Sequence, residues 1–175
     1  VGEPMTRRDI AKLVCNALDT KSKTTNQDLI AVHDCQFIED VTLVATNSED
    51  KTLGSDELAT SVGKYRITDS FDDSYIGAKG DMVVKDGKYF VAFSSDSQVT
   101  SAKYIVYSTL NDAILCYPAG NNTQIKQFKI SDTTTCYKES VAYTYGNLRS
   151  QMEMGDVLRI SYGADGEVDY LSYSE

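Results

Sequence analysis

The side chains that could carry out covalent chemistry in this chain are few. Its single histidine, His33, stands beside Asp34 and Cys35. A cysteine nucleophile needs a base at hand and a third group that orients the base. Neighbouring residues of a strand point to opposite faces, and no orienting group or oxyanion hole stands at a recognisable spacing. We therefore interpret His33 as a structural or surface residue, and we expect neither enzymatic activity nor catalytic residues.

Four cysteines could bind a metal, form disulfides or pack as small apolar side chains: Cys15, Cys35, Cys116 and Cys136. Structural zinc sites use closely spaced pairs such as Cys-x-x-Cys, and these four cysteines form no such pair. In an exported protein an even number of cysteines permits disulfides, and Cys116 could face Cys136 across neighbouring strands. The interpretation that we favour is that the thiols are free and buried.

Two turns are rich in carboxylates: Asp69, Asp72 and Asp73 in the first, and Asp165, Glu167 and Asp169 in the second. Calcium needs six or more oxygen ligands, and the familiar calcium loop has a defined spacing of acidic residues. Neither turn has that spacing, so we interpret both as solvated turns, with adventitious calcium as the alternative. The sequence predicts no metal site and no cofactor.

Tyrosines are numerous, with 12 in the chain, and most stand in its second half. An exposed row of tyrosines could form a platform on which sugar rings stack, because the side chain has an apolar face and a polar tip. The candidates for glycan stacking are Tyr143, Tyr145, Tyr162 and Tyr173. The alternative to a stacking platform is that these rings pack between strands and form cross-strand pairs.

The overall charge excludes one class of partner. The chain has 175 residues, with 17 Lys and Arg against 26 Asp and Glu, and a net charge of -9. Nucleic-acid binding needs a basic surface, so we expect no nucleic-acid partner. No stretch approaches about 18 consecutive apolar residues, so we expect no membrane span. The chain begins with Val1 rather than methionine, and we interpret it as a fragment of a longer protein whose targeting signal is missing.

The first expected element is an amphipathic helix over residues 6–18. Thr6 stands as its N-cap and Asp9, three residues on, as the reciprocal carboxylate of a capping box. Apolar residues then recur with the spacing of one helical face, at Ile10, Leu13, Val14, Ala17 and Leu18.

The rest of the chain has the pattern of β hairpins. Strand-like segments flank an Asp86-Gly87 dipeptide that favours a tight two-residue turn. A Gly-Asp pair, an apolar strand and an Asp-Gly turn occur at residues 80–91 and again at residues 155–168. We therefore predict a mainly β (α+β) fold, in which the N-terminal helix precedes two related small antiparallel β units. The predicted division is residues 1–26, 27–96 and 102–175.

Residues 3–18 resemble the last part of an S-layer homology (SLH) motif, which carries a Pro, an apolar residue, Thr-Arg-x-Glu and an aliphatic helix. Here Asp9 replaces the usual Glu and Ile10 the usual aromatic residue. The resemblance implies an exported surface protein of a Gram-positive, clostridial-type bacterium, located in the cell wall or S-layer. It also implies that Thr6, Arg7 and Asp9 contact anionic cell-wall polysaccharide. The alternative is that these residues only begin a surface helix.

Together these observations predict a non-enzymatic structural or spacer module of an S-layer-type surface protein. Its expected partners are cell-wall polysaccharide and other domains of the surface protein. The second hypothesis is a carbohydrate- or ligand-binding β module that uses the Tyr-rich second unit. An exposed tyrosine row would favour the second hypothesis, and tyrosines buried between sheets would favour the first.

Overall fold

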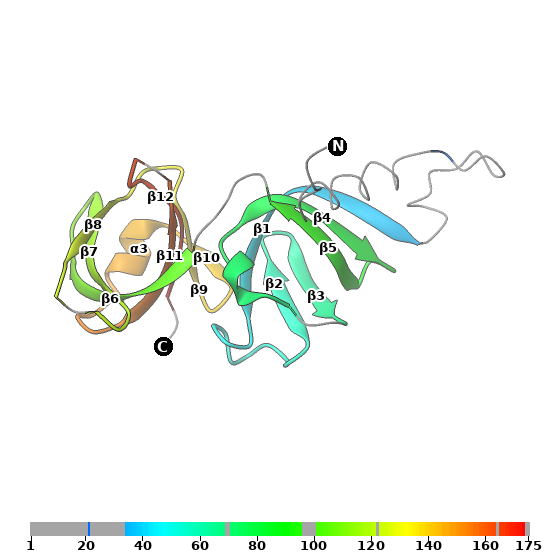
Figure 1. The fold of residues 1–175 in the computed structure, drawn as a ribbon, viewed down its shortest axis with the longest axis horizontal. Helices are drawn as coiled ribbons and strands as arrows, with labels where there is room; N and C mark the ends of the chain where they lie inside the picture. The colour runs from blue at the N-terminus through cyan, green and yellow to red at the C-terminus, as the bar shows by residue number, and fades with distance from the viewer. Residues whose placement is uncertain are drawn as a thin grey trace, which may run out of the picture.

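Two β sheets stand side by side along the long axis of the protein (Figure 1). The computed structural model describes residues 21, 34–68, 71–95, 101–121, 123–163 and 165–173. The prediction of a mainly β fold is confirmed. The predicted helix over residues 6–18, with Thr6, Arg7 and Asp9, lies outside the described residues, as do Cys15 and His33.

The first unit is a closed barrel with the strand order β1-β2-β3-β5-β4. Its elements are β1 (Cys35–Thr46), β2 (Glu57–Thr60), β3 (Gly63–Ile67), the short 3₁₀ helix η1 (Asp73–Tyr75), β4 (Lys79–Lys85) and β5 (Tyr89–Ser95). Neighbouring strands are antiparallel except β3 and β5, which are parallel. This connectivity is that of a five-stranded Greek-key barrel of the OB type.

Local sequence explains a turn and a bend in the barrel. Asp86 and Gly87 have φ angles of 55° and 62°, as a type I′ turn requires, and so confirm the predicted hairpin between β4 and β5. Strand β1 shifts register between Ile38 and Val41, where Asp40 has a φ of 56°. Such a bulge bends a strand, so β1 pairs with β4 along most of its length and with β2 near its end.

The second unit is a sheet with the order β10-β9-β12-β11-β6-β7-β8. Its elements are β6 (Ser101–Thr109), β7 (Ala113–Pro118), β8 (Lys126–Lys129), β9 (Thr135–Lys138), β10 (Val141–Tyr143), α3 (Tyr145–Arg149), β11 (Val157–Tyr162) and β12 (Val168–Tyr173). An isolated parallel bridge joins Lys129 at the end of β8 to Glu167, just before β12.

The two units share an order of connections. In the first, the strand order is β3-β2-β1-β4-β5, β3 pairs in parallel with β5, and η1 precedes β4. In the second, β8-β7-β6-β11-β12 repeats that order, the parallel bridge Lys129–Glu167 stands where β3 pairs with β5, and α3 precedes β11. The hairpins β4–β5 and β11–β12, which carry the Gly-Asp and Asp-Gly repeats, occupy corresponding places. The second unit adds two strands: β9, which pairs in parallel with β12, and β10, which pairs with β9.

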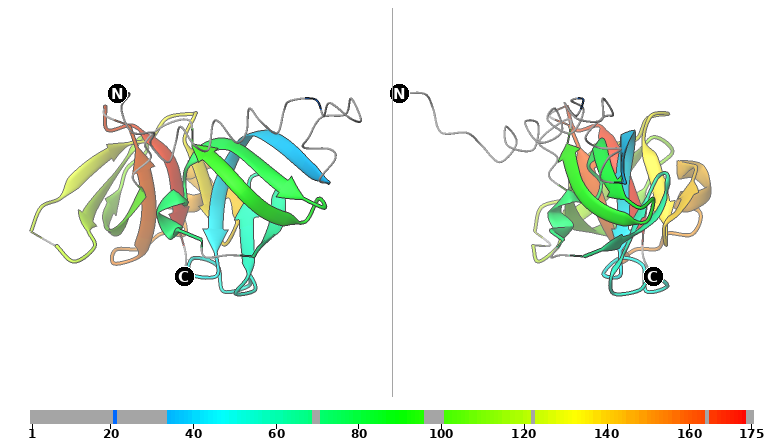
Figure 2. Two further views of the ribbon diagram at one scale, coloured as in Figure 1. Left: turned by 45° about the vertical axis from the view of Figure 1, so that its right-hand side comes forward. Right: turned by 90° about the vertical axis from the view of Figure 1, so that its right-hand side faces the viewer.

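Each unit has a hydrophobic core, and the two cores are joined. The core of the second unit is built around Phe128, Leu158 and Leu171. The core of the first unit includes Leu43 and Leu58, but it also includes two side chains of the second unit, Tyr137 and Tyr170. Figure 2 shows β1 and η1 of the first unit lying against the side of the second. Strand β12 is therefore buried on both of its faces.

No helix among the described residues has the length and apolar character needed to cross a membrane.

Candidate functional site

The contact between the two units is centred on Tyr170. This side chain leaves β12 on the face opposite Leu171, enters the core of the first unit and is 1% exposed. Its hydroxyl donates a hydrogen bond of 2.5 Å to the carbonyl oxygen of Val44 on β1. Burial raises the pKa of Tyr170, so its phenol stays protonated and can donate. The contact thus combines an apolar ring with a satisfied polar tip.

Gly77 makes room for this ring. Its φ is +89°, and a Cβ placed there would lie 2.6 Å from Cδ1 of Tyr170. That distance is below any ordinary contact between two carbons, and the φ lies in the left-handed region that favours glycine. Both its backbone angle and its neighbour therefore require glycine at this position.

A buried ion pair lies beside the tyrosine. Nη2 of Arg159, on β11, lies 2.6 Å from Oε1 of Glu49, in the loop after β1. The two side chains are 10% and 6% exposed. Nη1 of Arg159 also donates to the carbonyl oxygen of Asp73 and to the hydroxyl of Ser101, each at 3.2 Å. One guanidinium group therefore binds the β1–β2 loop and η1 of the first unit to β6 of the second.

The surroundings of Glu49 favour its charged form. Burial alone would raise the pKa of this carboxyl, but the hydrogen bond from Ser48 and the positive charge of Arg159 lower it below its ordinary value. Glu49 is therefore ionised at neutral pH, and the contact between the units contains a full ion pair.

A further hydrogen bond joins the units at the far side of the same loop. The hydroxyl of Ser140 donates to Oδ2 of Asp50 at 2.6 Å, and Asp50 is 1% exposed. Glu139 and Ser140 have φ angles of 47° and 65°, so a tight turn between β9 and β10 directs Ser140 at the first unit. Asp50 also accepts from the amide and hydroxyl of Thr52.

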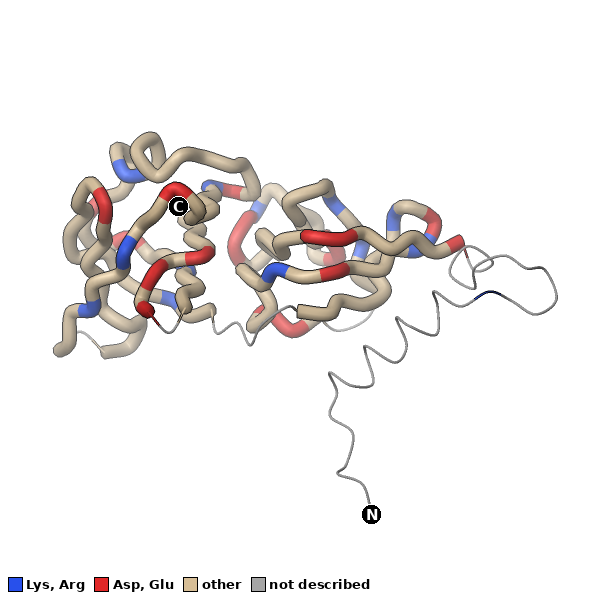
Figure 3. The backbone as a smooth tube through the Cα atoms, turned by 90° about the horizontal axis from the view of Figure 1, so that it is seen from above, with Lys and Arg blue, Asp and Glu red and all other residues tan. Residues whose placement is uncertain are grey.

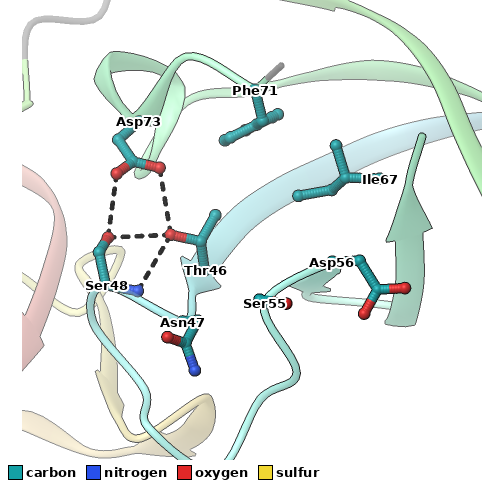
Figure 4. A pocket seen from close by; sticks show the side chains of 8 residues that line it. All are labelled: Thr46, Asn47, Ser48, Ser55, Asp56, Ile67, Phe71 and Asp73. Atoms are coloured by element: carbon teal, nitrogen blue, oxygen red, sulfur yellow. Dashed lines mark hydrogen bonds between the residues drawn. The ribbon is translucent and has the colours of Figure 1, made fainter. Parts of the chain in front are cut away.

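A pocket of about 380 Å³ opens next to the ion pair, on the first unit (Figure 4). Its polar lining comes from the end of β1, the β1–β2 loop and η1. Its apolar lining comes from the end of β3 and the segment that follows it. It is lined by Thr46, Asn47, Ser48, Ser55, Asp56, Ile67, Phe71 and Asp73. Its volume lies in the range of about 300–1,000 Å³ that is typical of ligand sites.

Two hydroxyl groups connect this pocket with the ion pair. The hydroxyl oxygen of Thr46 lies 3.1 Å from Oε2 of Glu49 and 3.1 Å from Oδ1 of Asp73. That of Ser48 lies 2.5 Å from the same Oε2 and 3.0 Å from Oδ2 of Asp73. Glu49 therefore contacts Arg159 with one oxygen and the hydroxyls at the pocket with the other.

The four tyrosines predicted to stack against a glycan do not form one exposed row. Tyr173 is 6% exposed and belongs to the core of the second unit, and Tyr143, Tyr145 and Tyr162 are half-buried against that core. The hydroxyl of Tyr145 donates to the carbonyl oxygens of Leu110 and Ala113. This burial favours the packing alternative over a stacking platform.

The other candidate residues are also placed by the structure. Cys116 and Cys136 are buried free thiols, as the favoured interpretation predicts. Burial raises their pKa values to about 12 and about 11. Asp72 caps η1 by accepting from the Ser74 amide. In the part of the chain that the structure describes, no group of three His, Cys, Asp or Glu side chains could hold a metal ion.

Sequence reasoning did not identify the groups that join the units. Glu49 and Asp50 fall in a polar stretch that reads as a solvated loop. Arg159 gives one signal: it is a charged residue in the middle of an otherwise apolar or small-residue strand, Val-Leu-Arg-Ile-Ser. Its position predicts either an outward-facing side chain or a partner, and the structure supplies the partner.

No protein-family model matches the chain, and no curated protein matches its sequence. The resemblance of residues 3–18 to an SLH motif therefore remains a prediction.

Proposed function

We propose that this chain is a non-enzymatic, rigid spacer module of a bacterial cell-surface protein. The observation that carries the proposal is the contact between the units, in which Tyr170 and the Arg159–Glu49 pair are both buried. Domains joined by a short connection move relative to one another unless their interface is large or strongly held. Here each unit contributes to a joint core, so we expect the pair to behave as one rigid piece.

The shared strand order supports the same proposal. We infer that the second unit repeats the first, with β9 and β10 as additions. Repeated units that contact each other set a fixed spacing between whatever lies at their two ends. The barrel topology itself indicates no activity, because one fold serves many functions. The support for a spacer role is therefore the rigid contact and not the fold type.

We further propose that the module is extracellular and associates with the cell wall or S-layer of a Gram-positive bacterium. This part rests on the SLH-like residues, where Thr6, Arg7 and Asp9 would contact anionic wall polysaccharide. A guanidinium group binds a sugar carboxylate through two parallel hydrogen bonds. Other domains of the surface protein would be its partners.

Small-angle X-ray scattering tests the spacer role. The wild-type chain is compared with Arg159→Met and Tyr170→Ala at several salt concentrations. We expect one arrangement of the two units to fit the wild-type curve at every salt concentration, and both variants to require a mixture of arrangements. A wild-type curve that itself requires a mixture would refute the proposal.

A pull-down with purified cell-wall polysaccharide tests the wall association separately. We expect the wild-type chain to be retained and Arg7→Ala to be lost from the polysaccharide. Absence of binding by both proteins would remove the anchoring role and leave the spacer role standing. Equal retention of both would place the polysaccharide site elsewhere in the chain.

A further inference from the structure

We propose that the pocket beside the ion pair binds a sugar residue that carries a free amine, such as a glucosamine unit. This inference does not depend on the spacer role. It rests on the lining of the pocket, which has an apolar wall, a hydroxyl-rich wall and a shortage of hydrogen-bond donors.

The apolar wall is made by Phe71 and Ile67. The ring of Phe71 is held in place by the edge of Phe90, with ring centroids 5.6 Å apart and planes at 81°. Aromatic rings are large, rigid apolar surfaces. Figure 4 shows Thr46, Ser48 and Asp73 on one side of the pocket, Ile67 and Asp56 on the other, and Phe71 at the top between them. A pyranose ring has the matching character, with an apolar C–H face and a rim of hydroxyl groups.

The part of the polar wall formed by Thr46, Ser48 and Asp73 has fewer donor hydrogens than acceptor contacts. Thr46 and Ser48 each have one hydroxyl hydrogen, but their oxygens make four short contacts with carboxylate oxygens of Glu49 and Asp73. At most two of the four contacts can be hydrogen bonds donated by these hydroxyls. Asp73 forms no ion pair with any described lysine or arginine. A ligand that donates hydrogen bonds would complete the wall.

The negative charge of the pocket decides which hydrogen-bond donor a ligand can bring to it. Asp56 and Asp73 both line the pocket, and acidic residues are spread over both units (Figure 3). Uronic acids and phosphorylated sugars would be repelled, whereas a protonated amine is attracted and offers three donors. Asp56 is 3.8 Å from Arg66, with both side chains about half exposed, so this pair leaves Asp56 able to meet a ligand. The class that fits is therefore an amino sugar whose amine is not acetylated.

The test uses a tetramer of β-1,4-linked glucosamine as the probe, with its fully N-acetylated form and an oligogalacturonate of equal length for comparison. Binding to the full chain is measured by titration calorimetry at physiological salt and mildly acidic pH. Backbone amide shifts in the NMR spectrum locate the site. We expect the glucosamine tetramer to bind, the N-acetylated form to bind at least tenfold more weakly, and the anionic oligomer not to bind. The shifts should cluster at residues 46–48, 55–56 and 71–73.

Variants separate this pocket from general attraction between a cationic probe and an acidic protein. Asp73→Asn and Asp56→Asn should each weaken binding about tenfold, as expected for loss of a charged hydrogen bond. Asp132→Asn removes the same charge from an exposed position of the second unit and should leave affinity unchanged. Phe71→Leu keeps an apolar side chain but removes the ring, and should also weaken binding.

Several results would overturn the proposal. They are absence of binding by the glucosamine tetramer, equal binding by the N-acetylated form, and an equal loss of affinity in Asp132→Asn. Amide shifts confined to the second unit would likewise refute it. Binding of methylamine as tightly as of glucosamine monomer would show that the pocket recognises a cation and not a sugar.

Discussion

Replacing Gly77 by alanine should disrupt the contact between the two units. The added Cβ would stand 2.6 Å from Cδ1 of Tyr170, whose ring is fixed by its hydrogen bond to Val44 and by burial in the first core. Either the ring or the backbone must move. We expect Gly77→Ala to lower the free energy of unfolding and to loosen the second unit from the first.

The magnitude has two sources, and a control separates them. A left-handed φ costs a residue with a Cβ about 1–2 kcal/mol, and forcing an extra methyl group into a packed site costs about 1–3 kcal/mol. Gly77→Ala should therefore cost about 2–5 kcal/mol. Gly120 has nearly the same φ, +86°, but no atom within 4 Å of the new Cβ. Gly120→Ala should thus show only the backbone cost.

The assay is denaturant unfolding of the wild type, both single variants and a double variant with Tyr170→Leu. Trimming Tyr170 removes the ring that Cβ would strike, so Gly77→Ala should cost about 1–3 kcal/mol less in the Tyr170→Leu background than in the wild type. A double-mutant cycle measures this coupling directly. Equal costs for Gly77→Ala and Gly120→Ala, or additive effects in the cycle, would refute the steric argument.

The other predictions concern the ion pair and the thiols. Arg159→Met should lower stability by at most about 3–5 kcal/mol, the cost of breaking a buried pair, because Lys103, 3.9 Å from the same oxygen of Glu49, is then its remaining cationic partner; chemical unfolding measures this, and a loss under 1 kcal/mol would contradict it. Because the pKa of Glu49 is lowered in the folded state, its contribution is full above its unfolded pKa of about 4.5 and is lost as the pH falls through the folded value. Stability measured from pH 7 to pH 3 should therefore fall less steeply in Glu49→Gln than in the wild type, and parallel curves would speak against the assignment. The raised pKa values of Cys116 and Cys136 predict that iodoacetamide labels both only on unfolding, as site-resolved mass spectrometry can show; rapid labelling of either in the folded chain would count against its burial.

Local sequence signals predicted much of the fold. The Asp86-Gly87 turn follows from the φ angles that those residues tolerate, and the apolar strands at residues 81–85 and 157–162 follow from their composition. The parallel pairings did not follow, because the pairing of β3 with β5 and of β9 with β12 joins segments far apart in sequence. Strand β2 also went unpredicted, since Glu57–Thr60 is short and only partly apolar.

The candidate site was less accessible to sequence reasoning. A tyrosine that packs into the neighbouring unit has the same alternating pattern as one that packs into its own, so Tyr170 could not be told from Tyr173. Glu49 reads as one acidic residue among several in a polar loop, and only the fold brings it within 2.6 Å of Arg159. Long-range polar pairs leave no local pattern in either segment.

Residual dipolar couplings of backbone N–H groups test the central claim most directly, because they report the orientation of each unit in solution. If Tyr170 and the Arg159–Glu49 pair hold the two units rigidly, one alignment tensor will fit the couplings of residues 35–95 and 101–173 together. Two tensors of clearly different magnitude for the two stretches would show that the units move independently and would contradict the account.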